Sequence, residues 1–299
     1  MHAFSRTLGL AAFLSAPLAA QPTPPPSAGT MRELAPGLSL IVGDIGNVAV
    51  AHGPEGVLLV DGQIPPTGPE LQAIVAKLSD KPIRFVIDTH WHGDHIGGNG
   101  RLSRAGAAIV AHDNVAKRLS AEQYMRGYDS VVPPAPPHYR PTLTFSDRLT
   151  FNLNGETIEA IHLANAHTDG DTVVRFRTAN VIHMGDIFFE GMFPFIDIAA
   201  GGRVQGMIAA VERVIALADD GTRIVPAHGA VSDRAGLIRY RDMLRDVTAK
   251  VQAGVRAGKS FADIRAAKPT AAYRLEGDAD AFVGFVYDSL VPPKDMRAR

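Results

Sequence analysis

The chain has 299 residues, of which 46% are hydrophobic and 20% charged, a composition typical of a folded globular protein. Lysine and arginine total 30 against 31 acidic residues, so no basic surface of the kind that binds a nucleic-acid backbone is expected. The absence of cysteine excludes disulfides, thiolate metal ligands and cysteine nucleophiles, and any metal must be held by His, Asp or Glu.

Residues 1–20 have the pattern of a secretory signal peptide, with Arg6 near the start and then an apolar run rich in leucine and alanine. Ser15 and Pro17 interrupt this run, which is shorter than the roughly 20 apolar residues of a membrane span, so no membrane anchor is expected. The mature protein is expected to be periplasmic or secreted. Residues 21–30 are rich in proline and predict a flexible tether, followed by a single domain over residues 31–299.

The first half of the domain mixes strands with one helix. Short β-branched runs predict strands at residues 38–42, 48–51, 57–60 and 83–88. Apolar residues at helical spacing predict a helix over residues 69–78, and Pro69 suits its first turn. Five prolines within residues 127–141 predict an irregular surface excursion.

The second half repeats this theme. Strands are predicted at residues 149–153, 157–163, 172–176, 181–184 and 224–226. Helices are predicted at residues 204–218, 237–255, 261–266 and 280–291. Two halves of this kind predict an α/β fold, a four-layer αβ/βα sandwich in which two mixed sheets pack face to face with helices outside.

A cluster of metal-ligand side chains follows the strand predicted at residues 83–88. His90, His92, Asp94 and His95 place three imidazoles and a carboxylate within six residues. An irregular, glycine-containing turn after a strand can direct all four inward, whereas a continued strand would send alternate side chains to opposite faces. Imidazole and carboxylate are suitable zinc ligands, so the segment predicts a metal site.

This segment resembles the His-x-His-x-Asp-His hallmark of the metallo-β-lactamase superfamily, and the rest of the chain carries the later motifs of that family in order. His167 lies in Ala-His-Thr-Asp-Gly, Asp186 follows His-Met-Gly, and His228 lies in Pro-Ala-His-Gly. Each residue comes just after a β run and beside a glycine or turn signal, as ligands on loops between strands do. The resemblance spans roughly residues 38–230.

The resemblance implies a pair of metal ions held by seven side chains. One ion is expected on His90, His92 and His167, the second on Asp94, His95 and His228, with Asp186 bridging the two. Two carboxylates and five imidazoles reduce the charge of two dications and leave a bridging hydroxide as nucleophile. Zinc, two ions per chain, is the expected metal, and iron and manganese are the alternatives.

Two further acids are expected to support the site. Asp61 ends a Val-Leu-Leu-Val-Asp-Gly segment that resembles the first motif of the family, in which the acid lies near the metal loop; an ordinary acid at a strand-to-turn junction is the alternative. Asp88 precedes His90 by two residues and is expected to orient an imidazole through its second nitrogen. His183 is expected in the core or behind the ligands, and not among them.

An aromatic segment follows Asp186 and predicts the substrate pocket. Phe188, Phe189 and Phe193 lie in a stretch containing glycine and proline that is well placed to wall an apolar pocket. Trp91, the only tryptophan, lies between two expected ligands and is a further candidate for the pocket wall, with ordinary packing as its alternative.

The resemblance implies a hydrolase that opens an acyl bond, an amide or an ester, by attack of a metal-bound hydroxide. Asp94 is the expected catalytic residue, because it would hold the proton of the nucleophile. The substrate is expected to be a small molecule, with no nucleic-acid partner. Hydrolysis of β-lactams is the first expectation, because the protein is expected in the periplasm, the compartment in which these cell-wall antibiotics act.

One departure from the family favours other substrates. In the best-known secreted di-zinc β-lactamases a Cys occupies the bridging position, and a Lys three residues later binds the substrate carboxylate. Here Phe189 stands three residues after Asp186, so the lysine is missing at that position, and Arg203 or another basic residue is the expected substitute anchor. The alternatives are a lactonase or a glyoxalase II-like thioesterase and, in another class, a secreted metal-binding or sulfur- or redox-relay accessory protein without turnover.

Overall fold

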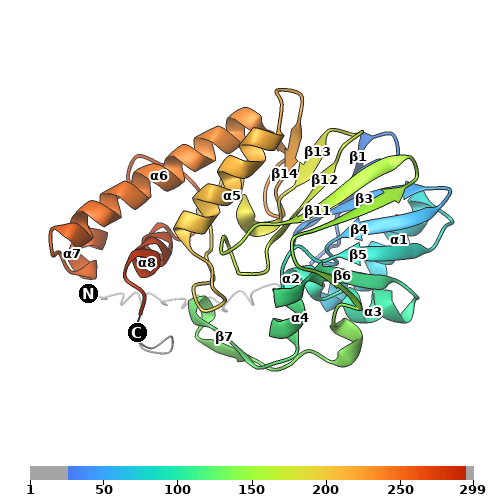
Figure 1. Ribbon diagram of the computed structural model, residues 1–299, viewed down its shortest axis with the longest axis horizontal. Helices are drawn as coiled ribbons and strands as arrows, with labels where there is room; N and C mark the ends of the chain where they lie inside the picture. Colours follow the sequence, from blue (N-terminus) through green and yellow to red (C-terminus); the bar gives the residue numbers. More distant parts are fainter. Residues whose placement is uncertain (1–25, 294–299) are drawn as a thin grey trace, which may run out of the picture.

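The computed structural model describes residues 26–293 as two β-sheets packed face to face, with helices on both outer faces (Figure 1). The first sheet has the order β1 (Thr30–Ala35), β2 (Leu38–Val42), β3 (Asn47–Gly53), β4 (Gly56–Val60), β5 (Ile83–Ile87), β6 (Ala108–His112) and β9 (Leu143–Phe145). The second has the order β10 (Arg148–Leu153), β11 (Glu156–His162), β12 (Thr172–Phe176), β13 (Val181–His183), β14 (Arg223–Val225) and β15 (Ser232–Asp233).

Helices and a separate hairpin complete the described chain. The α-helices are α1 (Gly68–Leu78), α2 (Gly93–Ile96), α3 (Asn99–Arg104), α4 (Asp113–Leu119), α5 (Val204–Leu217), α6 (Arg234–Arg256), α7 (Phe261–Ala266) and α8 (Ala279–Leu290). Four 3₁₀ turns lie at Pro65–Thr67, Arg126–Tyr128, Pro137–Tyr139 and Gly185–Ile187. Strands β7 (Gln123–Met125) and β8 (Ser130–Val132) pair only with each other. No helix within residues 26–293 combines the length and apolar character that a bilayer crossing requires.

Both sheets are mixed, as the sequence predicts. In the first, β1 to β4 pair antiparallel, and β4, β5, β6 and β9 pair parallel. In the second, only β13 and β14 pair parallel. Strand β4 is buried along its full length, because one face meets the other sheet and the other meets helices.

Three apolar clusters account for the four layers. Leu58 of the first sheet and Phe176 of the second are fully buried in one cluster between the sheets. Leu71 of α1 packs on the outer face of the first sheet, and Val211 of α5 and Leu244 of α6 pack outside the second. Each helix therefore buries its apolar stripe on a sheet, and the predicted four-layer α/β sandwich is confirmed.

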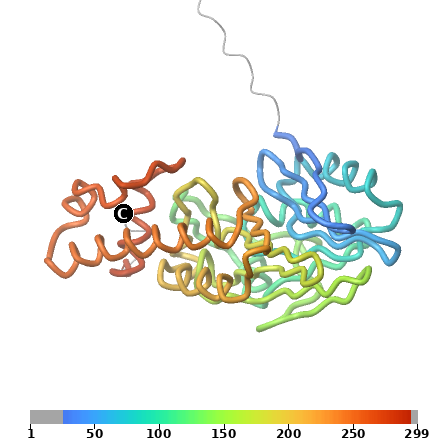
Figure 2. Tube along the Cα trace, turned by 90° about the horizontal axis from the view of Figure 1, so that it is seen from above, coloured from blue at the N-terminus to red at the C-terminus, as the bar shows by residue number. Residues whose placement is uncertain are grey.

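The C-terminal helices extend the molecule at one end. Figures 1 and 2 both show α6, α7 and α8 at the end away from the first sheet. Helix α6 packs on α5 and α8, and α7 packs on α6 and α8. Asp233 caps α6 by accepting a hydrogen bond from the Gly236 amide at 2.7 Å, which satisfies an N–H that has no partner within the helix.

The packed chain begins earlier than the sequence predicts. Residues 1–25, which include the expected signal peptide, lie outside the described part. Ala28 is fully buried, its amide donates to Glu70 at 2.7 Å, and its carbonyl accepts from Gln63 at 3.0 Å. The tether predicted to reach residue 30 therefore does not include residues 27–30, because polar groups of the folded domain bind this segment.

The expected irregular excursion over residues 127–141 is also corrected. It includes strand β8, which pairs with β7 from Gln123↔Val132 to Met125↔Ser130. The prolines follow this strand and lie before, in and just after the 3₁₀ turn Pro137–Tyr139, so they do not interrupt the ladder. The prediction of irregular structure is therefore correct only for the residues that follow β8.

Candidate metal centre

Four loops carry the expected ligands to one edge of the sandwich. The loop holding His90 and His92 follows β5 and leads into α2, which holds Asp94 and His95, and the turn holding Asp186 follows β13. His228 follows β14, which is parallel to β13, and His167 lies between β11 and β12. Because neighbouring parallel strands end at the same edge of a sheet, ligands distant in sequence come together there.

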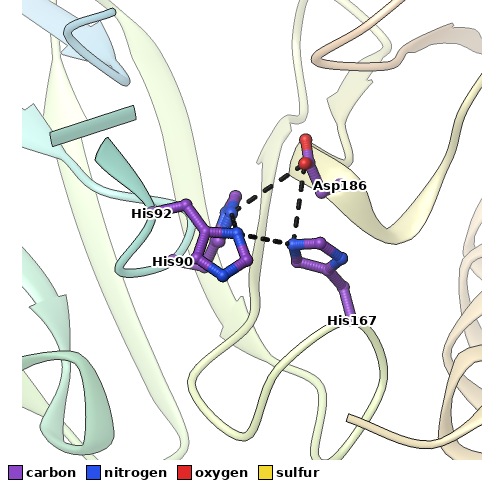
Figure 3. Close-up of side chains that lie close together, drawn as sticks. All are labelled: His90, His92, His167 and Asp186. Atoms are coloured by element: carbon purple, nitrogen blue, oxygen red, sulfur yellow. Dashed lines mark hydrogen bonds and ion pairs between the residues drawn. The ribbon is translucent and has the colours of Figure 1, made fainter. Parts of the chain in front are cut away.

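The first group consists of His90, His92, His167 and Asp186, all buried (Figure 3). The Nδ1 atom of His92 lies 3.0 Å from Nε2 of His90 and 3.0 Å from Nε2 of His167. The Oδ2 atom of Asp186 lies 3.6 Å from Nε2 of His167 and 3.9 Å from Nε2 of His90. Three ring nitrogens and a carboxylate oxygen thus face a common centre.

In His92 and His167, the ring nitrogen that points away from the common centre is hydrogen-bonded to another part of the chain. Nε2 of His92 donates to Oδ2 of Asp197 at 3.0 Å, and Nδ1 of His167 donates to the Phe195 carbonyl at 2.8 Å. Burial lowers the pKa of His167 to about 4, so this ring is neutral and its Nε2 carries a lone pair. This lone pair lies 3.0 Å from Nδ1 of His92, and a cation placed among these nitrogens would accept it.

The second group consists of Asp94, His95 and His228. Oδ2 of Asp94 lies 3.4 Å from Nε2 of His95 and 3.4 Å from Nε2 of His228. Oδ1 of Asp186 lies 3.4 Å from the same two nitrogens. Asp186 therefore directs one oxygen to each group, which is the position expected of a bridging ligand.

The electrostatics of the second group favour positive charge. Burial lowers the pKa of His228, but the carboxylates of Asp186 and Asp94 outweigh this effect and raise it to about 10. Burial opposes ionisation of Asp186, yet the imidazoles of His228 and His95 hold its pKa well below the usual range. Within residues 26–293, Oδ1 of Asp186 and Nε2 of His95 are buried without a hydrogen-bond partner. Ring nitrogens and carboxylate oxygens in this arrangement fit zinc.

Asp61 lies in the supporting position that the sequence predicts. Its Oδ2 accepts from Nδ1 of His95 at 2.8 Å, and its Oδ1 accepts from the Thr89 amide at 2.7 Å. The first contact leaves Nε2 of His95 directed at Asp94 and Asp186. Asp61 has a positive φ of 69°, a sparsely populated conformation that these hydrogen bonds maintain.

Gly185 allows the bridging acid to approach the ligand loop. It has a positive φ of 52°, and a Cβ atom there would lie 2.7 Å from Cβ of Thr89. Only glycine adopts this conformation without strain and leaves room for Thr89. The Gly-Asp pair at residues 185–186 thus places Asp186 between the two groups of ligands.

The expectation for Asp88 is wrong. Its Oδ2 accepts from Nδ2 of Asn99 at 2.9 Å, and no imidazole of the described residues binds it. Its position at the end of β5 directs it toward α3 instead of the ligands, and burial raises its pKa. A carboxylate that the sequence analysis does not single out, Asp197, binds the outer nitrogen of His92 instead.

Residues after the aromatic segment hold two of the ligands. Besides binding His92, Asp197 donates its amide to the His167 carbonyl at 2.9 Å, and its Oδ1 accepts from the Ala200 amide at 3.0 Å. The only sequence signal was an acid directly after Phe-Pro-Phe-Ile. Tyr128 was also missed: it lies 5.5 Å from Phe195 at the tip of the β7–β8 hairpin, beside the site.

The structure separates the four residues expected to form the substrate pocket. Trp91 is only 3% exposed and packs with Ile96 and other core residues, and its ring centroid lies 4.9 Å from that of His92. Phe193 stacks on Phe282 of α8, which places it in the apolar packing of the C-terminal helices. These two predictions are corrected to packing roles.

Phe188 and Phe189 both line a cavity of about 430 Å³ next to the site. The ring of Phe189 stacks on the imidazole of His228, with centroids 5.7 Å apart. Nη1 of Arg203 donates to the carbonyls of Ile198 and Gly202, so these contacts hold the guanidinium against the backbone. His183 is fully buried and contacts the Asn47 carbonyl, outside both ligand groups, as expected.

Comparison with known proteins decides the family. The sequence profile of the metallo-beta-lactamase superfamily matches residues 41–228, more than half of the chain and the segment that carries all seven ligand candidates. The chain belongs to this superfamily. Its members are metal-dependent hydrolases, which agrees with the two groups of ligands.

Individual relatives are distant. The chain is 28% identical over 147 residues to a metallo-beta-lactamase type 2 of Bacteroides fragilis, covering 49% of this chain and 53% of that one. It is 26% identical over 196 residues to an atrochrysone carboxyl ACP thioesterase of Aspergillus chevalieri, covering 64% and 54%. The chain therefore spans about half the length of both relatives.

A solved metallo-beta-lactamase from Pontibacter korlensis has the same fold. It superposes with a TM-score of 0.58 at 19% identity, covering 73% of this chain and 99% of that one. The fold of that protein therefore corresponds to about three quarters of this chain.

Proposed function

We propose that this protein is a two-metal hydrolase that opens a thioester or lactone with an apolar acyl group. The observation that carries the two-metal assignment is the position of Asp186, whose two oxygens face different ligand groups. A single carboxylate shared in this way is expected between two cations that act on one substrate. This proposal assigns His90, His92 and His167 to one ion and Asp94, His95 and His228 to the other, with Asp186 bridging.

Zinc is the proposed metal, two ions per chain, with iron and manganese as alternatives. When bound, the metals supply Lewis acidity toward the substrate carbonyl and ease the deprotonation of water near neutral pH. Asp197 and the Phe195 carbonyl keep hydrogens on the outer nitrogens of His92 and His167, so that the inner nitrogens stay bare. Asp61 does the same for His95.

Asp94 is the proposed catalytic residue. Its side chain is 34% exposed, whereas that of Asp186 is 7% exposed, so solvent reaches Asp94 more readily. Burial opposes its ionisation, but the imidazoles of His95 and His228 keep its pKa well below the usual range. An ionised carboxylate at the solvent side of the site accepts a hydrogen bond from the attacking water and orients its lone pair toward the carbonyl.

The residues beside the ligands favour an apolar substrate. Phe189 occupies the position where secreted di-zinc β-lactamases carry a carboxylate-binding lysine, and Arg203 is engaged with backbone carbonyls. A substrate carboxylate would find no replacement at these two positions, whereas an apolar acyl group would contact the Phe189 ring. The similarity to a fungal thioesterase supports the same substrate class.

Hydrolysis of β-lactams is the second candidate, favoured by the 28% identity to the Bacteroides fragilis metallo-beta-lactamase type 2. A metal-binding accessory protein without turnover is the candidate from another class. The complete set of seven ligand side chains argues against it, because a protein that only binds metal has no need for an open site with two cations.

Parallel assays distinguish these functions. The purified mature protein is analysed for metals per chain and tested on an acyl lactone, a glutathione thioester and a chromogenic β-lactam. We expect two metals and hydrolysis of the lactone or the thioester. Turnover of the β-lactam alone would favour the second candidate, and metal-loaded protein inactive on all three would contradict an acyl hydrolase. His90→Ala is the control, because it should lower metal content and activity together.

We also propose that the protein is exported to the periplasm or secreted. The support is the signal-peptide pattern of residues 1–20, which lie outside the described part of the structure. Cell fractionation with N-terminal sequencing of the mature chain tests this, and recovery of the intact N-terminus from the cytoplasm would contradict it.

A further inference from the structure

A cavity of about 430 Å³ lies between α6, the segment after Asp186 and the chain that precedes α8. Phe188 and Phe189 form one wall, Tyr240 and Met243 of α6 form another, and Leu275 belongs to the third. This volume falls within the range of small-molecule sites in proteins. None of the seven candidate metal ligands lines this cavity.

The cavity adjoins the candidate metal centre through Phe189. The Phe189 ring stacks on His228 at an interplanar angle of 11° and lies 6.1 Å from His167, and the same residue lines the cavity. The next amide, that of Glu190, donates to the His228 carbonyl at 3.3 Å, which ties the cavity wall to the ligand loop. Burial and the Asp186 carboxylate both raise the pKa of Tyr240, so the α6 wall lies within electrostatic range of the bridging acid.

The chemistry of the walls selects an uncharged, apolar occupant. Phe188, Tyr240 and Met243 are at most 6% exposed overall and present carbon-rich surfaces. The charged lining residues are Glu190, Arg239 and Asp242, which carry charges of both signs. No single sign of charge dominates, so the hydrophobic effect is the main available source of affinity.

We propose that this cavity binds the hydrocarbon chain of the acyl substrate, with the chain passing along Phe189, the residue that contacts both the cavity and His228. The assignment rests on the proposed acyl hydrolase function. It places the reacting carbonyl over the ligands and the aliphatic tail between the aromatic segment and α6. Specificity for chain length then resides in the C-terminal helices.

A chain-length series tests the proposal. Acyl thioesters from acetyl upward are assayed with the zinc-loaded protein, and kcat/KM should rise by up to about fourfold per buried methylene, from about 0.8 kcal/mol each. Leu275 is half-buried, and Leu275→Trp should fill the cavity and abolish this rise in kcat/KM with chain length. Leu78→Trp, on a half-buried leucine that packs outside the first sheet, is the matched control and should keep the wild-type slope.

A second variant and a binding measurement keep the test decisive. Met243→Ala should enlarge the cavity and shift the preferred chain to greater length. Calorimetry with 1-decanol, which needs no turnover, should detect binding to wild-type protein and about tenfold weaker binding to Leu275→Trp. Decanol binding without any acyl turnover would contradict the proposed function alone. No decanol binding, or equal chain-length slopes in all variants, would overturn the cavity assignment.

Discussion

Replacing Asp197 with asparagine tests how the protein holds His92. The Asp197 side chain is fully buried, its Oδ1 accepts from the Ala200 amide, and its Oδ2 accepts from Nε2 of His92. In Asp197→Asn the remaining carbonyl oxygen stays with Ala200, because that partner can only donate. The new amide then donates to Nε2 of His92, which moves the imidazole hydrogen to Nδ1, the atom that faces His90 and His167.

The expected effect is a loss of metal affinity at constant fold. Partners of this kind contribute about 10- to 100-fold to metal affinity, which corresponds to about 1.4–2.7 kcal/mol. Zinc affinity is measured by competition with a chromophoric chelator, and circular dichroism checks that the variant is folded. Asp219→Asn, at an exposed turn acid, is the matched control and should bind zinc as wild type does. A folded Asp197→Asn protein with zinc affinity within about twofold of wild type would refute this reasoning.

Further predictions concern stability. Leu244→Ala, at a fully buried position in α6, should lower the free energy of unfolding in urea by about 2.7–5 kcal/mol; a loss below about 1 kcal/mol would contradict the packing of α6. Arg118 donates to both oxygens of Asp169 at 2.7 Å, and Arg118→Met should cost about 1–3 kcal/mol in the same assay, whereas unchanged stability would argue against this pair. The stacked rings of His112 and His162, 3.5 Å apart, have pKa values lowered by burial, and the positive charge of His162 further lowers that of His112. As the pH falls, these histidines therefore bind protons in the unfolded chain before they do so in the folded protein. The free energy of unfolding should be at its full value above about pH 6.5 and should decrease below it. His162→Gln should make this decrease smaller, as measured by urea titrations at a series of pH values. Removing zinc with a chelator should lower the melting temperature, and zinc restored to about 100 times its Kd should add about 2.7 kcal/mol; an identical melting curve with and without zinc would contradict a bound metal.

Local sequence patterns determined the ligand types and most elements. The spacing of apolar residues predicts helices over residues 204–218 and 261–266, which the structure has as Val204–Leu217 and Phe261–Ala266. Periodicity succeeds here because each helix buries one face on a sheet. The resemblance of the His-x-His-x-Asp-His segment and of the later motifs to the metallo-β-lactamase superfamily indicated that seven separate side chains belong together, and the structure brings them into two adjoining groups.

Tertiary structure alone decided which side chains complete the site. Asp197 reaches His92 across 105 positions of sequence, while Asp88, two residues before His90, faces Asn99 instead. Trp91 enters the core although ligands flank it on both sides. The physical reason is that a local pattern records which residues are apolar or polar, whereas the direction of a loop side chain depends on what packs against that loop from distant parts of the chain.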